Sequence, residues 1–410
     1  MEYGKLNIRV VSDNTNYPIP DATVRITSEN EPERIIEEAL TNEEGQLNDI
    51  ELEAPPVDYS MKPSANKPYS EYTITVRAPG FESIEVNCAE IFSGQKALQE
   101  TSLLPLATGE LDSAELFVIP DHTLWGDYPP KIPESEIKTV EETGEIVLSQ
   151  VVIPEYVIVH NGPPGDSSAK DYYVKYKDYI KNVASSEIYS TWPEATLQAN
   201  ILAIQSFTLN RVYTEWYRNK GYEFTITTST AYDHKWIPNR NVFDSISRVV
   251  EEIFSNYLSR PNVEQPILTQ YCDGKNVTCP NWMSQWGSKS LGDQGYSAIE
   301  ILRNYYGDSI FINSTDEISG VPSSYPGTPL RVGDAGEKVR QIQKQLNVVA
   351  NAYPLIPKIA EDGVFGPATE EAVKTFQRIF NLTPDGIVGF RTWYRLSEIY
   401  VGVSRIAELN

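Results

Sequence analysis

The sequence predicts a multidomain chain with an all-β sandwich at the N-terminus, a central α+β domain and a small all-α domain of three helices at the C-terminus. Apolar residues alternate at the strand period in residues 1–105. The pattern becomes helical from about 170 to 260 and mixed from 264 to 312. Two matching turn phrases then separate helical stripes after residue 328. A chain of 410 residues is long enough for about two to four such domains, each with its own core.

The net charge of −23 is concentrated in the first 150 residues, which hold 29 acidic and 10 basic side chains, against 28 and 24 in the remainder. This acidity excludes nucleic acid as a partner of the N-terminal part. It is either a solubility feature or the mark of a separable segment with its own role. No apolar run reaches the length of a membrane span, and the first residues lack the basic flank and apolar stretch of a secretory signal.

Residues 1–105 are expected to form the acidic β-sandwich. Strand-period alternation is clearest around residues 8–10, 24–26 and 72–76, with turn clusters of proline, glycine and acidic residues between them. This arrangement resembles the transthyretin-like or Cna-B-like β-sandwich, which is found beside many secreted enzymes. Nothing in these residues resembles a catalytic site.

Residues 106–150 are rich in proline and glutamate, a composition that predicts an exposed, loosely ordered linker. The apolar block that begins at Val151 marks the start of the central domain, residues 151–312. A second linker, residues 313–328, leads to the C-terminal domain, residues 329–400.

A junction between two predicted helices places one glutamate in unusual surroundings. Thr191 and Glu194 are spaced as a capping box, with Pro193 in the first turn of the second helix. Glu187 lies at the junction, among the apolar and aromatic residues of the segment 183–192. Desolvation there would raise the pKa of its carboxyl group, which suits a general acid near neutral pH. The alternative is a solvated glutamate at a helix end, which the pattern alone favours.

The segment from Glu187 to Pro193 resembles the SpoIID/LytB domain, whose hallmark is a Glu-Met/Ile-x-x-x-Trp-Pro run followed by an Ala-rich helix. Two further hallmarks follow in the right order, Met-Ser-Gln-Trp-Gly at 283–287 and Glu-Ile-Leu-Arg-Asn-Tyr-Tyr at 300–306. The resemblance implies a peptidoglycan lytic transglycosylase in which Glu187 is the catalytic residue. It implies no cofactor.

The implied reaction needs one carboxyl group. Glu187 as an acid protonates the oxygen that links N-acetylmuramic acid to N-acetylglucosamine, and the bond breaks through an oxocarbenium-like transition state. As a carboxylate it then accepts the proton of the muramic C6 hydroxyl, which attacks C1 and closes a 1,6-anhydro ring. A hydrolase would need a second carboxylate, for which Asp233 and Asp273 are the candidates, although a turn or structural role suits each of them.

Substrate contacts are expected from five further residues, since amides, hydroxyls and aromatic faces suit glycans: Gln205, Tyr271, Ser284, Gln285 and Trp286. Core packing is the alternative for aromatic residues, and it is favoured for the tyrosine pair at 305–306. Many relatives carry arginine in the helix after the catalytic glutamate, where this chain has Gln205.

Three cysteines are too few for a disulfide framework. Some relatives bind zinc through one histidine and two cysteines, a set that His234, Cys272 and Cys279 could supply. The spacing differs from theirs and three ligands leave a structural site incomplete, so we expect no metal. A disulfide between the two cysteines is an alternative. A tight hairpin at Asp273 would place them out of register, which favours two buried free thiols.

The C-terminal domain carries the phrase Asp-Gly-x-x-Gly-x-x-Thr twice, at 362–369 and 385–392. Each Asp-Gly predicts a turn, and each threonine is placed to cap the segment that follows. With the helical stripes around these phrases, the pattern resembles the small helical peptidoglycan-binding domain. The resemblance assigns wall-binding positions to four residues: Gln343, Phe376, Gln377 and Trp393.

The order of domains resembles the clostridial spore cortex-lytic enzymes of the SleC family. Members are made in the mother cell without a secretory signal, packed into the spore as inactive precursors and activated by a subtilisin-like germination protease. The resemblance implies that residues 1–150 are a pro-region, and we expect cleavage near Ser149, Gln150 and Val151. The expected partner is the peptidoglycan of the spore cortex, with no nucleic acid and no membrane. Two other classes stay open: a non-catalytic wall-binding or amidase-enhancing protein, and a phage-type lysin.

Overall fold

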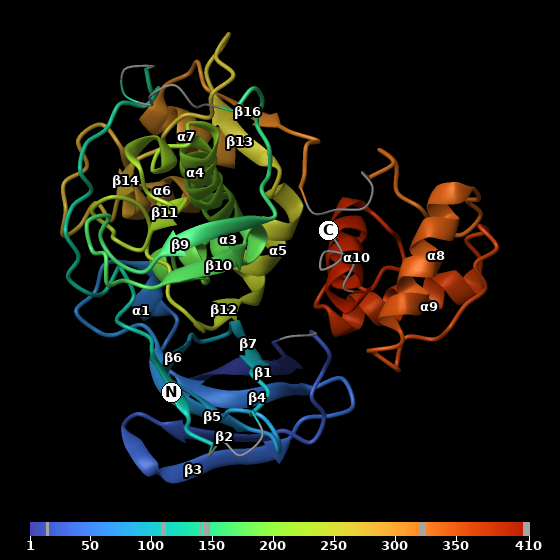
Figure 1. Cartoon of the computed structure of the whole chain (residues 1–410). Coiled ribbons are helices and arrows are strands. Elements are labelled where there is room, and N and C mark those ends of the chain that lie inside the picture. Colours follow the sequence, from blue (N-terminus) through green and yellow to red (C-terminus); the bar gives the residue numbers. More distant parts are fainter. Residues whose placement is uncertain (14–15, 108–111, 140–141, 143–147, 320–324, 405–410) are drawn as a thin grey trace.

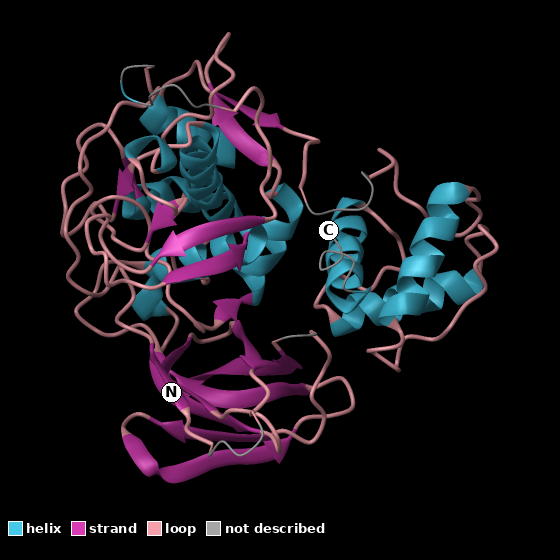
Figure 2. Ribbon diagram, in the orientation of Figure 1, coloured by secondary structure: helices cyan, strands magenta, loops and turns pink. Residues whose placement is uncertain are grey.

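The computed structural model describes residues 1–13, 16–107, 112–139, 142, 148–319 and 325–404. In Figure 1 a strand-rich N-terminal part lies below a helix-rich central part, and the C-terminal helices lie to one side. Figure 2 shows the same division by secondary structure, with the longest strands gathered in the N-terminal part. The chain is multidomain with mixed α and β structure, as predicted.

The strands of the N-terminal part form two sheets that share one core. Its elements are β1 (Glu2–Ser12), β2 (Thr23–Ser28), β3 (Glu31–Leu40), β4 (Gln46–Ala54), α1 (Asp58–Met61), β5 (Ser70–Arg77), β6 (Ile84–Ile91), β7 (Lys96–Leu103) and β8 (Glu115–Val118). One sheet has the order β3-β2-β5-β6-β8, and the other has the order β12-β7-β1-β4, where β12 (Val242–Phe243) belongs to the central part. Ile8 of β1, Val24 of β2 and Ile74 of β5 are buried, so alternating apolar residues of both sheets fill the core.

The strands predicted around residues 8–10, 24–26 and 72–76 are confirmed as parts of β1, β2 and β5. The likeness to transthyretin-like or Cna-B-like sandwiches stays a prediction. β8 lies beyond residue 105, in the segment expected to be a linker, because it pairs in parallel with residues 84–87 of β6. The sheet therefore continues past the predicted boundary.

The N-terminal and central parts are joined by a shared sheet and a buried ion pair. β12 pairs antiparallel with residues 97–98 of β7. Beside it, Arg240 Nη2 lies 2.6 Å from Glu90 Oε2, and both side chains are buried. Asn241 Nδ2 donates to the Glu90 carbonyl at 2.9 Å, and the Glu90 N–H donates to Asn241 Oδ1 at 3.1 Å. Polar contacts thus fix this interface in one register.

In the residues that the structure describes, the central part packs four α-helices and several short strands around a fifth helix, α4. Its elements are β9 (Tyr156–His160), β10 (Asp171–Lys175), α3 (Tyr176–Glu187), α4 (Glu194–Tyr213), η1 (Arg218–Lys220), β11 (Ile226–Thr227), α5 (Asp244–Ile253), β13 (Asn256–Ser259), β14 (Tyr271–Cys272), β15 (Met283–Ser284), α6 (Gln285–Asp293), α7 (Ala298–Tyr306) and β16 (Phe311–Ser314). α4 is buried on nearly every side. Its polar residues bond locally: the Ser206 and Thr208 hydroxyls donate to carbonyls one turn earlier, each at 2.8 Å. Among the helices described, none has the length and apolar character needed to cross a membrane.

The predicted capping box at the start of α4 is wrong. Pro193 is the N-cap residue, and no side chain caps the helix. The hydroxyl of Thr191 donates instead to Ser60 Oγ at 2.8 Å, in the N-terminal part. Trp192 Nε1 likewise donates to the Ser60 carbonyl at 2.9 Å. A contact between distant segments therefore replaces the local cap.

Residues 121–138, which we call the strap, cross the central part as a packed segment without helix or strand. His122, Leu124, Lys131 and Lys138 of the strap are all buried. The prediction of an exposed, loosely ordered linker is therefore wrong for this segment. The prolines at 129, 130 and 133 stay exposed, whereas Glu134 and Glu136 are partly buried because the central part supplies polar partners.

The C-terminal part consists of α8 (Glu337–Val349), α9 (Pro367–Ile379) and α10 (Phe390–Ser404). A glutamine on each of the first two helices holds the turn that follows. Gln343 donates to the Val364 carbonyl at 3.0 Å and accepts from the Gly363 N–H at 2.8 Å. Gln377 makes the same two bonds in the turn 385–387, at 3.0 and 2.9 Å. The repeated phrase in the sequence is thus a repeated glutamine-anchored turn.

The sequence predicted that each threonine of the repeated phrase caps a helix, and this prediction is wrong. Thr369 Oγ1 lies 3.2 Å from Gln343 Nε2, and Thr392 Oγ1 lies 3.1 Å from Gln377 Nε2. Both threonines lie inside their helices, α9 and α10, rather than before them. They complete the sockets that hold the glutamines.

Gln343→Leu is expected to lower the free energy of unfolding of the C-terminal part by about 1–3 kcal/mol, because it leaves the Gly363 N–H buried without its acceptor. Denaturant unfolding, with hydrogen exchange read on α8 and α9, would measure this. The matched control is Gln294→Leu, at an exposed glutamine that bonds only to Ser290, for which we expect a change below about 0.5 kcal/mol. Equal effects of the two substitutions would contradict the structural role of Gln343.

Candidate active site

Glu187 is the last residue of α3, and three segments of the central part hold it through its carboxyl group and its main-chain carbonyl. It is 2% exposed, so the alternative of a solvated glutamate is wrong. Oε1 accepts from the Lys235 main-chain N–H at 2.6 Å, and Oε2 accepts from the Tyr271 hydroxyl. The carbonyl of Glu187 accepts from Gln285 Nε2 at 3.0 Å. The carboxyl group is therefore fixed in place by β14 and the loop before β12, and the main chain of Glu187 is fixed by α6.

Burial raises the pKa of Glu187 above its ordinary value. The positive charge of Lys131 and the hydrogen bond from Tyr271 act in the opposite direction without cancelling the effect of burial. Burial also lowers the pKa of Lys131. The direction for Glu187 is the one predicted from the sequence, and it keeps the acid form available at higher pH than an ordinary glutamate allows.

Tyr271 is supported from behind by a buried histidine. The rings of Tyr271 and His234 stack with centroids 6.0 Å apart and planes 12° from parallel. His234 Nδ1 lies 3.0 Å from the Tyr179 hydroxyl. Burial raises the pKa of Tyr271 well above its ordinary value and lowers that of His234 well below it. Tyr271 therefore remains a hydroxyl donor to Glu187, next to a neutral imidazole.

The start of α6 supplies the other predicted substrate residues near Glu187. Gln285 lines the same pocket as Glu187, while Ser284 caps the helix through a bond from the Gly287 N–H to Oγ at 2.9 Å. Trp286 is 9% exposed, and its ring packs against that of Trp192 with centroids 5.0 Å apart. Gln285 and Tyr271 are thus brought to the acid, whereas Ser284 and Trp286 support the surrounding structure.

Gln205 is not brought to this pocket. It lies in the middle of α4, is fully buried and donates to the carbonyls of Ile253 and Asn256, each at 2.8 Å. Its amide therefore joins α4 to the end of α5 and the start of β13. A sugar cannot reach it while these bonds are in place.

The two candidate second carboxylates differ in their surroundings. Asp233 is fully buried and accepts from Arg211 Nε at 2.8 Å and from the Tyr217 hydroxyl at 2.6 Å, so its role is structural. Asp273 accepts from the main-chain N–H groups of residues 276–277 at 2.8 and 2.9 Å, which makes a turn. Asp273 also lines the pocket beside Glu187. It is the carboxylate to test if water takes part in the reaction.

The prediction that the two cysteines of the central part are free thiols is wrong. Cys272 and Cys279 form a disulfide, with Cα atoms 5.6 Å apart. The tight hairpin assumed from the sequence is absent from this described segment, because residue 272 ends β14 and the chain makes a longer loop before β15, which pairs with β14 in parallel. The loop brings the two sulfur atoms together. His234, the proposed third ligand of the zinc alternative, contacts Tyr179 and Tyr271 instead.

The four predicted wall-binding residues all lie in the core of the C-terminal part: Gln343, Phe376, Gln377 and Trp393 are 0–1% exposed. They maintain its fold, and a glycan would have to bind other side chains there. At the predicted cleavage position, Ser149 and Gln150 are exposed, and Val151 is buried with its carbonyl accepting from Thr315 Oγ1 at 2.7 Å.

Sequence reasoning missed Lys131 and the strap that carries it. Lys131 lines the pocket with Glu187, and its ammonium group lies 4.9 Å from the centroid of the Tyr271 ring. The signal in the sequence was a lysine directly after Pro129 and Pro130, at a position that composition alone assigns to a solvated linker. Lys235 was also missed, because it contributes its main-chain N–H rather than its side chain.

Two larger cavities lie away from Glu187. One of about 510 Å³ is lined by residues of all three parts, and one of about 660 Å³ lies between the central and C-terminal parts. Neither is lined by Glu187 or Tyr271. The buried acid with a raised pKa places the candidate active site at the smaller pocket.

A peptidoglycan-binding domain is present at the C-terminus: residues 335–396 match the family described as "Putative peptidoglycan binding domain". The chain is 24% identical over 249 residues to the N-acetylmuramoyl-L-alanine amidase CwlL of Bacillus licheniformis, covering 59% of this chain and 65% of that protein. It is 39% identical over 77 residues to the zinc D-Ala-D-Ala carboxypeptidase of Streptomyces albus G, covering 18% and 28%. The chain thus spans less than two thirds of either relative. These findings point to a cell-wall-related protein that carries a peptidoglycan-binding domain.

Two solved structures are similar over part of the chain. The SleB N-terminal domain is 30% identical, with 18% of this chain and 97% of that one covered and a TM-score of 0.17. The 5-hydroxyisourate hydrolase of Klebsiella pneumoniae is 15% identical, with 25% and 92% covered and a TM-score of 0.17. TM-scores of this size establish no common fold.

Tyr271→Phe is expected to raise the pKa of Glu187 further, because the hydrogen bond that it removes favours the carboxylate. In the reaction that the sequence resemblance implies, the first step needs protonated Glu187, so the expected activity falls as pH rises through the pKa of Glu187. In the variant this fall should lie at higher pH, which a pH profile of kcat would measure. Tyr173→Phe, at a tyrosine that is 74% exposed, is the control. A profile of Tyr271→Phe that overlays the unmodified one would exclude this role.

Proposed function

We propose that this chain is the precursor of a peptidoglycan lytic transglycosylase of the SpoIID/LytB type, and that Glu187 is its general acid and base. One observation carries the proposal. The carboxyl group of Glu187 is buried, is held by Tyr271 and the Lys235 N–H, and has a raised pKa. It lies in a chain that also carries a peptidoglycan-binding domain.

One carboxyl group can complete the reaction without water. Protonated Glu187 gives its proton to the oxygen between N-acetylmuramic acid and N-acetylglucosamine as the bond from C1 to that oxygen breaks. The resulting carboxylate takes the proton of the muramic C6 hydroxyl, whose oxygen forms the new bond to C1. The products are a free 4-hydroxyl on N-acetylglucosamine and a 1,6-anhydromuramic end, and Glu187 is protonated again.

The same proposal includes a site of action and an activation step. The substrate would be the peptidoglycan of the spore cortex, and a subtilisin-like germination protease would cut near Ser149 and Gln150 to remove the N-terminal part. Both residues are exposed and precede the buried Val151, which is the arrangement that a protease needs at the border of a stable unit. Location in the spore is part of this proposal.

Mass spectrometry of fragments released from purified spore cortex tests the reaction. The chain beginning at Val151 should release fragments that end in 1,6-anhydromuramic acid. Reducing ends would indicate a hydrolase and direct attention to Asp273, which lines the same pocket. Release of stem peptides without glycan cleavage would favour the amidase activity that the name of the CwlL relative states. Binding without any release would favour a non-catalytic wall-binding protein.

A further inference from the structure

The pocket at Glu187 is too small for a sugar, and the strap makes it small. Its volume is about 60 Å³. Sites for small molecules usually measure about 300–1,000 Å³. Much of its lining comes from strap residues: Thr123, Gly126, Tyr128, Pro129, Pro130 and Lys131. The opposite side is Glu187 with Tyr271, Gln285 and Asp273. The segment that closes the pocket therefore belongs to the same chain and precedes the central part.

Lys131 occupies the part of the pocket that carries the chemistry. Its ammonium group lies 4.9 Å from the centroid of the Tyr271 ring and 5.5 Å from that of Phe207. It donates to the Asp233 carbonyl and lies 3.5 Å from the Thr230 carbonyl. A positive charge thus stands among aromatic faces beside the buried carboxyl group. This is the sign of charge that develops on the sugar in an oxocarbenium-like transition state.

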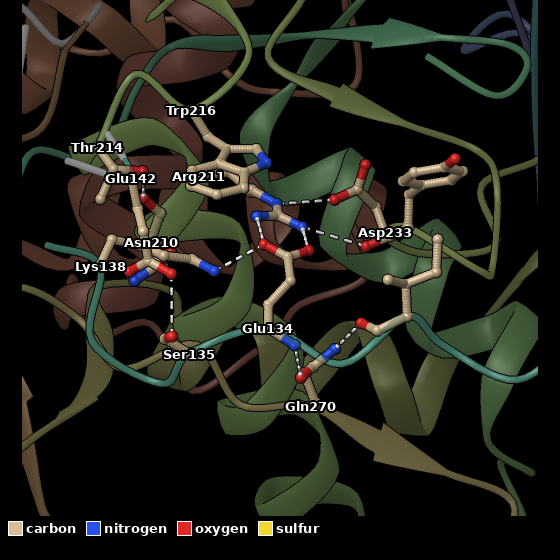
Figure 3. Close-up of polar contacts among 12 residues, drawn as sticks. Glu134, Ser135, Lys138, Glu142, Asn210, Arg211, Thr214, Trp216, Asp233 and Gln270 are labelled. Carbon is tan, nitrogen blue, oxygen red and sulfur yellow. Dashed lines mark hydrogen bonds and ion pairs between the residues drawn. The ribbon is translucent and has the colours of Figure 1, made fainter. Parts of the chain in front are cut away.

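The strap is anchored just beyond Lys131 by a buried ion network (Figure 3). Glu134 receives two bonds from Arg211 of α4, at 2.8 and 2.6 Å, and Arg211 also donates to Asp233 at 2.8 Å. Although burial opposes it, the hydrogen bonds and the charge of Arg211, together with Lys138, lower the pKa of Glu134 to about 2. The side-chain amide of Gln270 accepts from the Glu134 N–H at 2.9 Å and donates to the main-chain carbonyl of Ile132 at 2.7 Å. The anchor is therefore charged at neutral pH and specific in geometry.

Further contacts hold both ends of the strap. At its start, the N–H and hydroxyl of Thr123 both donate to the Ser186 carbonyl at 3.1 Å, next to Glu187 in the chain. Near its end, Glu136 receives two bonds from Arg260 at 2.7 and 2.8 Å. Two of the glutamates that the sequence assigned to a solvated linker, Glu134 and Glu136, are thus paired with arginines of the central part.

We propose that the strap is a built-in inhibitor of this site, in which Lys131 and the two prolines before it take the place of the glycan at Glu187. The inference rests on the proposed function of Glu187. It adds what blocks the site and where the block is released. The strap residues that bond the central part all precede Ser149 in the chain. A cut at Ser149 therefore leaves the strap bound until the ion pair between Glu134 and Arg211 breaks. Activation then has two separate events, a cut and a departure.

The test uses two variants of the full chain. Lys131→Ala removes the side chain that fills the pocket beside Glu187. Glu134→Gln weakens the ion pair with Arg211 at nearly constant side-chain volume. Lys5→Ala is the matched control, at a lysine of β1 whose side chain is 49% exposed. Three readouts are taken on each: hydrogen exchange of residues 121–138, binding of a soluble N-acetylglucosamine–N-acetylmuramic acid tetrasaccharide, and release of fragments from purified cortex. Both variants should bind the tetrasaccharide and release fragments at least about tenfold faster than the unmodified chain. Lys5→Ala should match the unmodified chain.

The outcomes separate this proposal from the proposed function. If the unmodified full chain binds and cleaves as fast as both variants, the proposal that the strap inhibits the site is wrong, while the proposed transglycosylase activity stands. Faster exchange and new tetrasaccharide binding in the variants, without cleavage by them or by the chain from Val151, would support the strap and reject the transglycosylase. If the variants neither bind nor cleave, while the chain from Val151 does both, the proposal that the strap inhibits the site is wrong. Since Glu134→Gln and Lys131→Ala disturb different contacts, the failure of one to fold leaves the other as the test.

Discussion

Glu187→Gln is expected to abolish release of soluble fragments from cortex by the chain that begins at Val151, with a loss of about 10³-fold or more. General acid–base catalysis contributes about 10²–10⁴-fold, and here one group serves both as acid and as base. Glutamine keeps the volume of the side chain, and its amide oxygen can still accept from the Lys235 N–H that bonds Oε1 at 2.6 Å. The site should therefore lose its proton without losing its shape.

The matched control is Glu194→Gln, at an exposed glutamate in the first turn of α4. It removes the same charge seven residues away and should leave the rate within about twofold. Circular dichroism and the Tm of both variants would show whether the fold is intact. Full activity of Glu187→Gln would reject the assignment of the acid, whatever the products.

Arg240→Met is expected to destabilise the full chain by about 3–5 kcal/mol, the second large effect, because it leaves Glu90 buried without its partner. Burial already raises the pKa of Glu90 more than Arg240 lowers it, so the charged form depends on the guanidinium. Arg240 also donates to the Ser185 carbonyl, in the last turn of α3. Scanning calorimetry and denaturant unfolding would measure the loss, and the interface with the N-terminal part should open first.

The double variant Arg240→Met with Glu90→Leu isolates the cause. Replacing both members of a buried pair with apolar groups is often neutral, so most of the lost stability should return. A double-mutant cycle gives the coupling between the two residues. Additive losses would mean that Arg240 acts through the Ser185 carbonyl rather than through Glu90.

Local sequence signals predicted the elements that depend on local sequence. Alternation placed β1, β2 and β5, and the helix junction placed the end of α3 at Glu187. The turns after α8 and α9 follow from their Asp-Gly pairs, although the glutamines that hold them come from the preceding helices. β12 could not be predicted, since two residues near 242 pair with β7 far earlier in the chain. Such pairing leaves no periodic trace in the sequence.

The same limit explains what was missed in the site. Glu187 was identified because its motif and its helix end are contiguous in the sequence. The strap was not, because proline- and glutamate-rich segments are ordinarily solvated. What buries this one is Arg211, which α4 supplies to Glu134, and Arg260, which lies before β14 and pairs with Glu136. The composition of a segment does not show which charged residues from distant parts of the chain will pair with it in the fold.

The strand that the central part lends to the N-terminal sheet has a consequence for the products of a cut. β7 is an interior strand only because β12 lies beside it. Pulling the two parts apart would turn β7 into a bare sheet edge and would uncover Phe243, whose side chain is fully buried. A free N-terminal fragment would then carry an open template for strand addition, with the risk of aggregation that such edges bring. Staying docked on the mature chain, or rapid digestion after leaving it, is how that risk would be avoided.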